Sequence, residues 1–286
     1  MRRKVNHRPS RLLLPAAAAL ALAAISLGGC QRAGVDRAAA EPAALTLHVP
    51  CVISGPILKA VGAYQDAHPE IELRVETDKP LAALREAAKA QESAAVVITM
   101  GDVEMGWLTD AGAVEPRSVR TIAHNTYPLV LVSAAAAEGR LDTLADLKRP
   151  DVKRIHLEDP ARSTLGARAE RSLKELGLWE KIESKIVRPE PDVMVLDPVV
   201  SGEADAVVVF RGCLFAEAGG EGMAPRTIRI IGELPRANQP PIPYLAAPLD
   251  GAPDFEVAEA FVDFMTSPEG REALESAGLA PPGEPQ

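Results

Sequence analysis

Three short stretches place a hydroxyl or carboxyl side chain between a strand-like segment and a helix-like segment. They contain Ser54, then Thr77 with Asp78, and then Ser163 with Thr164. Such residues cap the first turn of a helix, whose unpaired backbone N–H groups and positive dipole end attract anions. Since α/β proteins also cap their helices in this way for stability alone, a structural role stays open beside an anion-binding role.

The segments around these residues alternate between strand-like and helix-like patterns. Short apolar runs predict strands at 45–49, 71–75, 94–99, 129–132, 154–157 and 206–210. Apolar residues at helical spacing follow several of these runs, and a closing helix over 255–265 is expected to break at Ser267-Pro268. The alternation predicts an α/β fold with largely parallel sheets, in which ligands bind beyond the carboxyl ends of the strands. We therefore expect the capped helix starts to converge on one cleft.

The first 29 residues have the order of an export signal. Five basic residues up to Arg11 precede an apolar run at 12–27, which ends at Leu27-Gly28-Gly29-Cys30. This ending resembles a lipobox, in which the cysteine becomes the lipidated first residue of the mature protein; an ordinary signal peptide is the alternative. We expect residues 1–29 to be removed, Cys30 to carry the lipid, and 30–44 to form a flexible tether. The predicted location is outside the cytoplasm, lipid-anchored at a membrane that faces the periplasm or the cell exterior.

Charge and composition exclude several classes of protein. The formal net charge is −9, and removal of five cations with residues 1–29 makes it −9 − 5 = −14, which argues against nucleic-acid binding. An aromatic content of 3% does not favour an aromatic-lined sugar site. The sequence has no Walker loop, nucleophile elbow or zinc-spaced Cys/His cluster, so we expect neither an enzyme nor a cofactor. The remaining chain, about 240 residues, suits two lobes.

Several stretches together resemble the molybdate-binding family of periplasmic solute-binding proteins. Asn125 stands before the apolar run 129–132 and fits the segment that crosses into the second lobe. The most specific stretches are Leu144-Ala145-Asp146-Leu147, Ile155-His156-Leu157-Glu158-Asp159-Pro160, Leu173-Lys174-Glu175-Leu176-Gly177-Leu178-Trp179 and Val199-Val200-Ser201-Gly202-Glu203-Ala204-Asp205-Ala206.

The resemblance implies a two-lobed, type II periplasmic-binding-protein (venus-flytrap) fold with a mostly parallel sheet in each lobe. Lobe I would hold 45–123 plus 240–282, and lobe II would hold 124–239. The implied function is that of an ABC importer's solute-binding lipoprotein, a monomer that captures an oxyanion of the molybdate or tungstate type for a permease and ATPase. The ligand contacts implied by the resemblance are Cys51, Ser54, Thr77, Asp78, Thr164, Leu165, Met194 and Phe210.

Some of these positions depart from the family's pattern. Cys51 stands near the place of a serine, and Phe210 lacks the hydroxyl of the family's tyrosine. Cys213 stands where an aspartate is expected, and a carboxylate at Asp78 would repel a dianion at short range. The fold therefore transfers from the resemblance more safely than the ligand does.

The same positions support a second hypothesis. Cys51, Cys213, Met194 and Met100 could together bind a soft ion such as Cu(I), or a thiophilic species such as arsenite. The two cysteines could instead form a disulfide or fill apolar space. A third hypothesis, from another class, is a receptor that reports ligand occupancy to a membrane sensor instead of a transporter.

Overall fold

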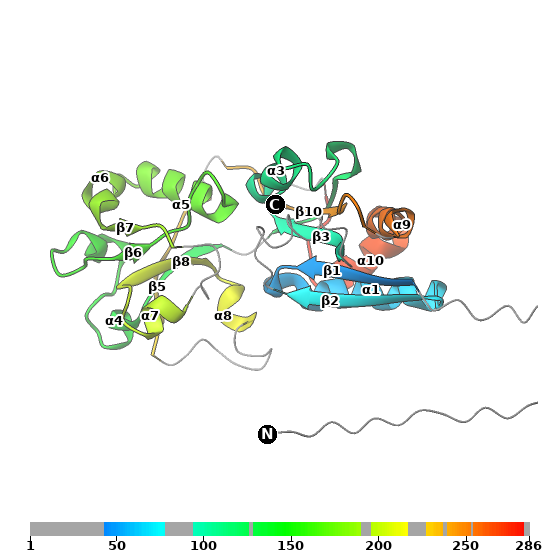
Figure 1. Ribbon diagram of the computed structural model, residues 1–286. Coiled ribbons are helices and arrows are strands. Elements are labelled where there is room, and N and C mark those ends of the chain that lie inside the picture. The colour runs from blue at the N-terminus through cyan, green and yellow to red at the C-terminus, as the bar shows by residue number, and fades with distance from the viewer. Residues whose placement is uncertain are drawn as a thin grey trace, which may run out of the picture. The chain divides into compact units, whose positions relative to one another are not determined.

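The computed structural model describes residues 43–77, 94–125, 128–189, 196–216, 227–236, 239–252 and 254–282. All of them belong to one compact unit, Glu41–Gln286. They form two five-stranded sheets, each with its own helices (Figure 1). We call the first sheet with its helices lobe I, and the second sheet with its helices lobe II.

The sheet of lobe I has the strand order β2-β1-β3-β10-β4. Its strands are β1 (Ala43–Val49), β2 (Ile71–Thr77), β3 (Ala94–Met100), β4 (Arg120–Asn125) and β10 (Ile242–Pro248). β1 pairs in parallel with β2 and β3, whereas β10 pairs antiparallel with both β3 and β4. Four strands therefore run in one direction, and only β10, which comes from much later in the chain, runs in the other.

The sheet of lobe II repeats this arrangement in the order β7-β6-β8-β5-β9. Its strands are β5 (Leu129–Ser133), β6 (Ile155–His156), β7 (Ile186–Val187), β8 (Ala206–Phe210) and β9 (Arg229–Glu233). Here β5 is the strand that runs against its neighbours. Mostly parallel sheets were predicted and are confirmed, with one antiparallel strand in each. The predicted residue limits of the two lobes stay a prediction.

Helices connect and cover the strands. The described α-helices of lobe I are α1 (Ser54–Ala67), α3 (Asp102–Asp110), α9 (Phe255–Thr266) and α10 (Pro268–Ser276). Those of lobe II are α4 (Ala134–Ala137), α5 (Thr164–Glu175), α6 (Trp179–Ile182), α7 (Asp197–Val200) and α8 (Cys213–Ala216). Short 3-10 helices are η1 (Cys51–Ile53), η2 (Pro116–Ser118), η3 (Leu144–Lys148) and η4 (Glu183–Lys185). The predicted break at Ser267-Pro268 is confirmed, because Ser267 ends α9 and its side chain caps α10. Within the described ranges, no helix has both the length and the apolar character that crossing a bilayer requires.

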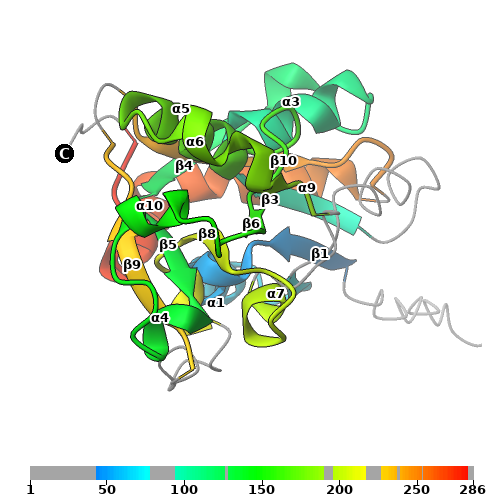
Figure 2. The same ribbon diagram turned by 90° about the vertical axis from the view of Figure 1, so that its left-hand side faces the viewer.

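Consecutive strand residues are buried on opposite faces of each sheet. In β3, Val96 and Ile98 pack into the cluster under α1, while Val97 packs into the cluster under α3. In β8, Val208 and Phe210 pack into the cluster that includes residues of α5 and α6, while Val207 and Val209 pack into the cluster that includes residues of α7 and α8. Figure 2 shows α5 and α6 on one side of β8 and α7 on the other. Burial on both faces explains why these strands are unbroken apolar runs rather than alternating patterns.

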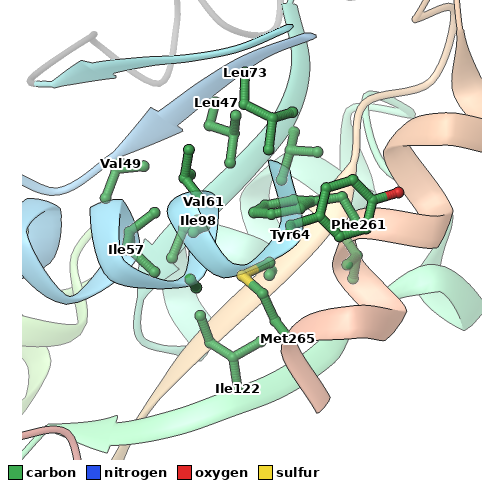
Figure 3. Close-up of a cluster of buried hydrophobic side chains, with 14 of the residues drawn as sticks. Leu47, Val49, Ile57, Val61, Tyr64, Leu73, Ile98, Ile122, Phe261 and Met265 are labelled. Atoms are coloured by element: carbon green, nitrogen blue, oxygen red, sulfur yellow. The ribbon is translucent and has the colours of Figure 1, made fainter. Parts of the chain in front are cut away.

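The core of lobe I lies between its sheet and the helices α1 and α9 (Figure 3). Leu47 and Ile98 from the strands meet Ile57 and Tyr64 of α1. Tyr64 lies edge-on to Phe261 of α9, with ring centroids 5.1 Å apart. Since Phe261 is fully buried, its truncation to alanine would cost about 3–5 kcal/mol. This core fixes the directions of β1 and β3, whose carboxyl ends lead to the candidate site.

Candidate functional site

The candidate site lies beyond the carboxyl ends of the parallel strands. In lobe I, Val49 at the end of β1 pairs with Thr77 at the end of β2, and β3 ends nearby at Met100. η1 and α1 follow β1, and α3 follows β3. In lobe II, β6 leads to α5 and its parallel neighbour β8 leads to α8. Among the described residues, each lobe thus presents two helix starts beyond the carboxyl ends of its strands, where α/β proteins bind ligands.

The helix starts of the two lobes contact each other in pairs. α3 of lobe I packs against α5 of lobe II, and η1 of lobe I packs against α8 of lobe II. We call the region around these two contacts the carboxyl-end site.

The start of α5 is capped as its sequence predicts. Ser163 accepts a hydrogen bond from the backbone N–H of Gly166 over 3.2 Å, and its hydroxyl donates to the carboxylate of Glu158. Gly166 lies so close to the preceding loop that a Cβ would stand 2.4 Å from the carbonyl oxygen of Glu158. A glycine is therefore required for this loop to fold against the helix start.

Thr164, the first residue of α5, binds a carboxylate of the other lobe. Its backbone N–H donates to Glu104 Oε1 over 2.8 Å, and its hydroxyl donates to Glu104 Oε2 over 2.5 Å. The Thr164 hydroxyl also accepts from the backbone N–H of Val103 over 3.2 Å. Every polar atom that Thr164 directs toward lobe I is thus paired with the first turn of α3.

Two further interactions link α3 to α5 and to the loop before it. The guanidinium of Arg162 lies 5.9 Å from the ring centroid of Trp107 on α3, a cation–π distance. Asp102 at the start of α3 attracts Arg168 of α5 and raises its pKa, although burial has the larger effect and lowers that pKa overall. The α3–α5 contact therefore includes charged groups from both lobes.

Burial dominates the electrostatics of the two carboxylates here. It raises the pKa of Glu104 to about 7, against the opposing effect of the hydrogen bonds from Thr164; the nearby Glu158 raises it further. Burial also raises the pKa of Glu158 above its usual value, and the hydrogen bond from Ser163 opposes that shift. A proton can therefore enter or leave this contact near neutral pH.

The predicted ligand contacts are distributed unevenly around the site. Thr164 lies in the α3–α5 contact and is 1% exposed. The side chains of Leu165 and Phe210 are buried in the core of lobe II, so a ligand would meet these positions through the backbone. Thr77 is exposed at the end of β2. Asp78, Met194 and the predicted lipid-carrying Cys30 lie outside the described residues, and all eight ligand roles stay predictions.

The expected cap at Ser54 is wrong. Ser54 is the first residue of α1 itself, and Ile53 holds the cap position without a side-chain hydrogen bond. The physical reason is the 3-10 turn of η1, which continues directly into α1 and moves the helix start toward the strand.

Two of the sulfur-bearing residues stand in the segments of the second contact. Cys51 begins η1, which packs against α8, and α8 begins at Cys213. Cys213 is partly buried between two core clusters of lobe II. Met100 packs against the cores of both lobes. For Cys51 the structure describes the backbone alone, so the choice between ligand, disulfide and packing roles stays open.

Glu104 and Gly101 are the residues that sequence reasoning missed. α3 was not predicted, because its apolar residues do not form a regular helical stripe. A usable signal was present, since a buried strand is followed by a glycine and two acidic residues, Asp102 and Glu104. This is the same strand-to-helix pattern that revealed the start of α5.

The chain is similar in sequence to known bacterial proteins. It is 22% identical over 232 residues to YvgL of Bacillus subtilis (strain 168), whose assigned name is that of an ABC transporter substrate-binding lipoprotein; this covers 78% of the chain and 85% of YvgL. The molybdate-binding protein ModA of Rhodobacter capsulatus is 26% identical over 151 residues, 52% of this chain and 55% of ModA.

A solved structure confirms the fold. The periplasmic molybdate-binding protein of Azotobacter vinelandii superimposes with a TM-score of 0.58 at 19% identity, covering 85% of this chain and 100% of that one. The expected periplasmic-binding-protein fold and the resemblance to molybdate-binding proteins are therefore confirmed. Residues 45–280 match the family described as bacterial extracellular solute-binding protein, whose members bind solutes and are not enzymes. The chain belongs to this family of bacterial extracellular solute-binding proteins.

Proposed function

We propose that this protein is the solute-capturing lipoprotein of an ABC importer and that it encloses a tetrahedral oxyanion of the molybdate or tungstate type at the carboxyl-end site. Cys30 would anchor it to a membrane, and a permease with its ATPase would receive the solute. The assigned name of YvgL and the names of the two molybdate-binding proteins support this proposal.

The observation that carries the proposal is the carboxylate held at the start of α5. Thr164 offers a backbone N–H and a hydroxyl, and both donate to one negatively chargeable group that comes from the other lobe. Neutral donors at a helix start are the usual means of binding an oxyanion. A donor set that binds a carboxylate across the two lobes is suited to a small oxyanion in the same place.

The net charge makes local donors necessary. With a formal net charge of −9 for the whole chain, the long-range field repels an anion. Binding must then come from short-range hydrogen bonds in a site from which water is excluded, where such bonds are strongest.

The test is calorimetric titration of molybdate, tungstate and sulfate into the reduced, metal-free domain that begins after Cys30, at pH 6 and at pH 8. We expect saturable binding at micromolar affinity or better, about −8 kcal/mol or more favourable. Thr164→Val should abolish the heat. Thr109→Val should leave it unchanged, because the hydroxyl of Thr109 bonds within α3 to the carbonyl of Gly106. Absence of binding at both pH values would refute the oxyanion proposal.

A soft ion is the second candidate, favoured by the contact between η1 and α8. The two segments that carry Cys51 and Cys213 lie against each other, and thiolate sulfur is the preferred ligand of Cu(I). Among the side chains that the structure describes, no group of three or more His, Cys, Asp and Glu forms a metal site. Titration of Ag⁺ into the wild type and into Cys51→Ser and Cys213→Ser tests this candidate. A thiol assay under denaturing, non-reducing conditions identifies a disulfide.

A further inference from the structure

Glu104 occupies the donors that the proposed oxyanion would use. Both of its carboxylate oxygens accept hydrogen bonds from Thr164, at 2.8 Å from the backbone nitrogen and 2.5 Å from the hydroxyl. Since the hydroxyl of Thr164 has one proton, it cannot donate to a solute while it donates to Glu104.

The close approach of the two helix starts is built into the backbone. Gly101, just before α3, has φ +128, a conformation that side-chain-bearing residues rarely adopt. A Cβ at this position would stand 2.0 Å from the hydroxyl oxygen of Thr164. Because Gly101 has no side chain, the backbone can bring Glu104 within hydrogen-bonding distance of Thr164 at the start of α5.

Other contacts hold Glu104 in this position. Val103, its neighbour on α3, donates its N–H to the Thr164 hydroxyl, and the ring of Trp107, three residues later, lies under Arg162. These two contacts hold α3 against the start of α5 and the loop before it, and they thereby keep Glu104 next to Thr164.

The geometry points to Glu104 as an internal anion that competes with an anionic solute for Thr164, so that Glu104 determines which solutes the carboxyl-end site accepts. This inference rests on the proposed function, because it takes the proposed solute to be an anion. A solute that carries two charges must displace an ionised Glu104 or meet it at contact distance, where like charges cost several kcal/mol. A protonated Glu104 presents no such charge.

The charged groups around Glu104 make its ionisation sensitive to pH. Glu158 faces it from the loop before α5, and Asp102 lies on its own helix. Arg168 of α5 and Arg162 of the preceding loop are the cations that face α3 among the described residues. Burial raises the pKa of Glu104 to about 7, so a fall from pH 8 to pH 6 should protonate most of it. Oxyanion affinity should then rise as the pH falls.

The first test needs no solute. The backbone amide resonance of Thr164, followed by NMR in the ligand-free wild type, should titrate near pH 7 because this N–H donates to Glu104. In Glu104→Gln the titration should be absent, and in the matched control Asp110→Asn, exposed at the far end of α3, it should persist. An amide that does not titrate in the wild type, or that still titrates in Glu104→Gln, overturns the inference whatever the solute is.

The second test measures affinity for molybdate and sulfate. At pH 8, Glu104→Gln should bind either anion about ten-fold more tightly than the wild type or better, a change of about 1.4 kcal/mol, and Asp110→Asn should match the wild type. At pH 6 the advantage of Glu104→Gln should shrink. If Glu104→Gln binds these anions at pH 8 no more tightly than the wild type, Glu104 does not compete with the solute, while the proposal of an oxyanion site is unaffected. If neither protein binds either anion while the Thr164 amide titrates as expected, both the oxyanion proposal and the selective role of Glu104 fail.

Discussion

The contact of α3 with α5 and the contact of η1 with α8 both join lobe I to lobe II, but they present different donor atoms. The first offers hydroxyl, amide and carboxylate groups, with Thr164 bound to Glu104. The second brings together the two segments that carry Cys51 and Cys213. The N–H and hydroxyl groups of the first contact are hydrogen-bond donors that suit an oxyanion, whereas thiol sulfur suits a soft metal ion. The two contacts therefore differ in composition although both lie at the carboxyl ends of strands, and experiments must address each contact separately.

The largest effect is expected from Gly101→Ala, which would break the α3–α5 contact. The new Cβ would collide with Thr164 and would force an unfavourable backbone conformation. Strain of about 1–3 kcal/mol and overpacking of similar size together predict a loss of about 4 kcal/mol in the free energy of unfolding. Denaturant unfolding of the wild type and of Gly101→Ala measures this loss in the free energy of unfolding. The control Gly106→Ala within α3, where a Cβ meets nothing within 4 Å, should be neutral or slightly stabilising. Equal effects of both changes would show that α3 does not depend on close contact with α5.

The pH dependence of stability should depend on Glu104. Its pKa is raised from 4.5 to about 7 in the folded protein, so between these values the folded state holds more protons than the unfolded state. The contribution of Glu104 to the free energy of unfolding is then fully present below pH 4.5 and is lost as the pH rises through 7, by at most about 3 kcal/mol. Urea unfolding between pH 5 and pH 8 should show this fall. Glu104→Gln should remove a large part of it, and Glu158, whose pKa is also raised, should maintain the rest. An identical fall in wild type and Glu104→Gln would contradict this account.

A smaller loss of stability is expected from Thr164→Val. The change leaves the N–H of Val103 and one oxygen of Glu104 without the Thr164 hydroxyl, and an unsatisfied buried polar group costs about 1–3 kcal/mol. Thr164→Ser, which retains the hydroxyl, should lose less than half as much. Thermal unfolding at pH 7 distinguishes the two. If serine and valine were equally destabilising, the methyl group rather than the hydroxyl would stabilise the contact.

The smallest effect on oxyanion binding is expected from Cys213→Ser. If the α3–α5 contact binds the solute, molybdate affinity should change by less than about two-fold, under 0.5 kcal/mol. Binding of Ag⁺ should fall by far more if the η1–α8 contact is a thiol site. Calorimetry with both ions on one protein preparation makes the comparison direct. A ten-fold loss of molybdate affinity would show that the two contacts act as a single site.

The sequence predicts the strands that are continuous apolar runs and misses several of the others. β8 lies at 206–210, as predicted, because an apolar run buried on both faces is a local signal. β10 was missed, since Pro243 and Pro248 at its two ends argue against a strand inside a sheet. β9 was missed because its residues are mostly polar and exposed. These strands are stabilised by partners that are distant in sequence, which local patterns do not report.

The candidate site shows the same limit. The cap of α5 could be read locally, because Ser163 and Gly166 are three residues apart. The bond between Glu104 and Thr164 joins residues 60 positions apart, and no spacing rule connects them. The resemblance to molybdate-binding proteins directed attention to Thr164 but not to the residue that binds it.

The late position of β10 in the chain has a consequence for the order of folding during export. A chain that is translocated from its amino end releases β1 to β4 first, but the sheet of lobe I lacks its fourth strand in space until Ile242–Pro248 emerges. Lobe II needs only residues up to Glu233 to complete its sheet. Lobe II can therefore finish folding while lobe I still exposes the edges of β3 and β4, and these edges are open to chaperones or proteases until the segment from Glu233 to Pro248 has also emerged.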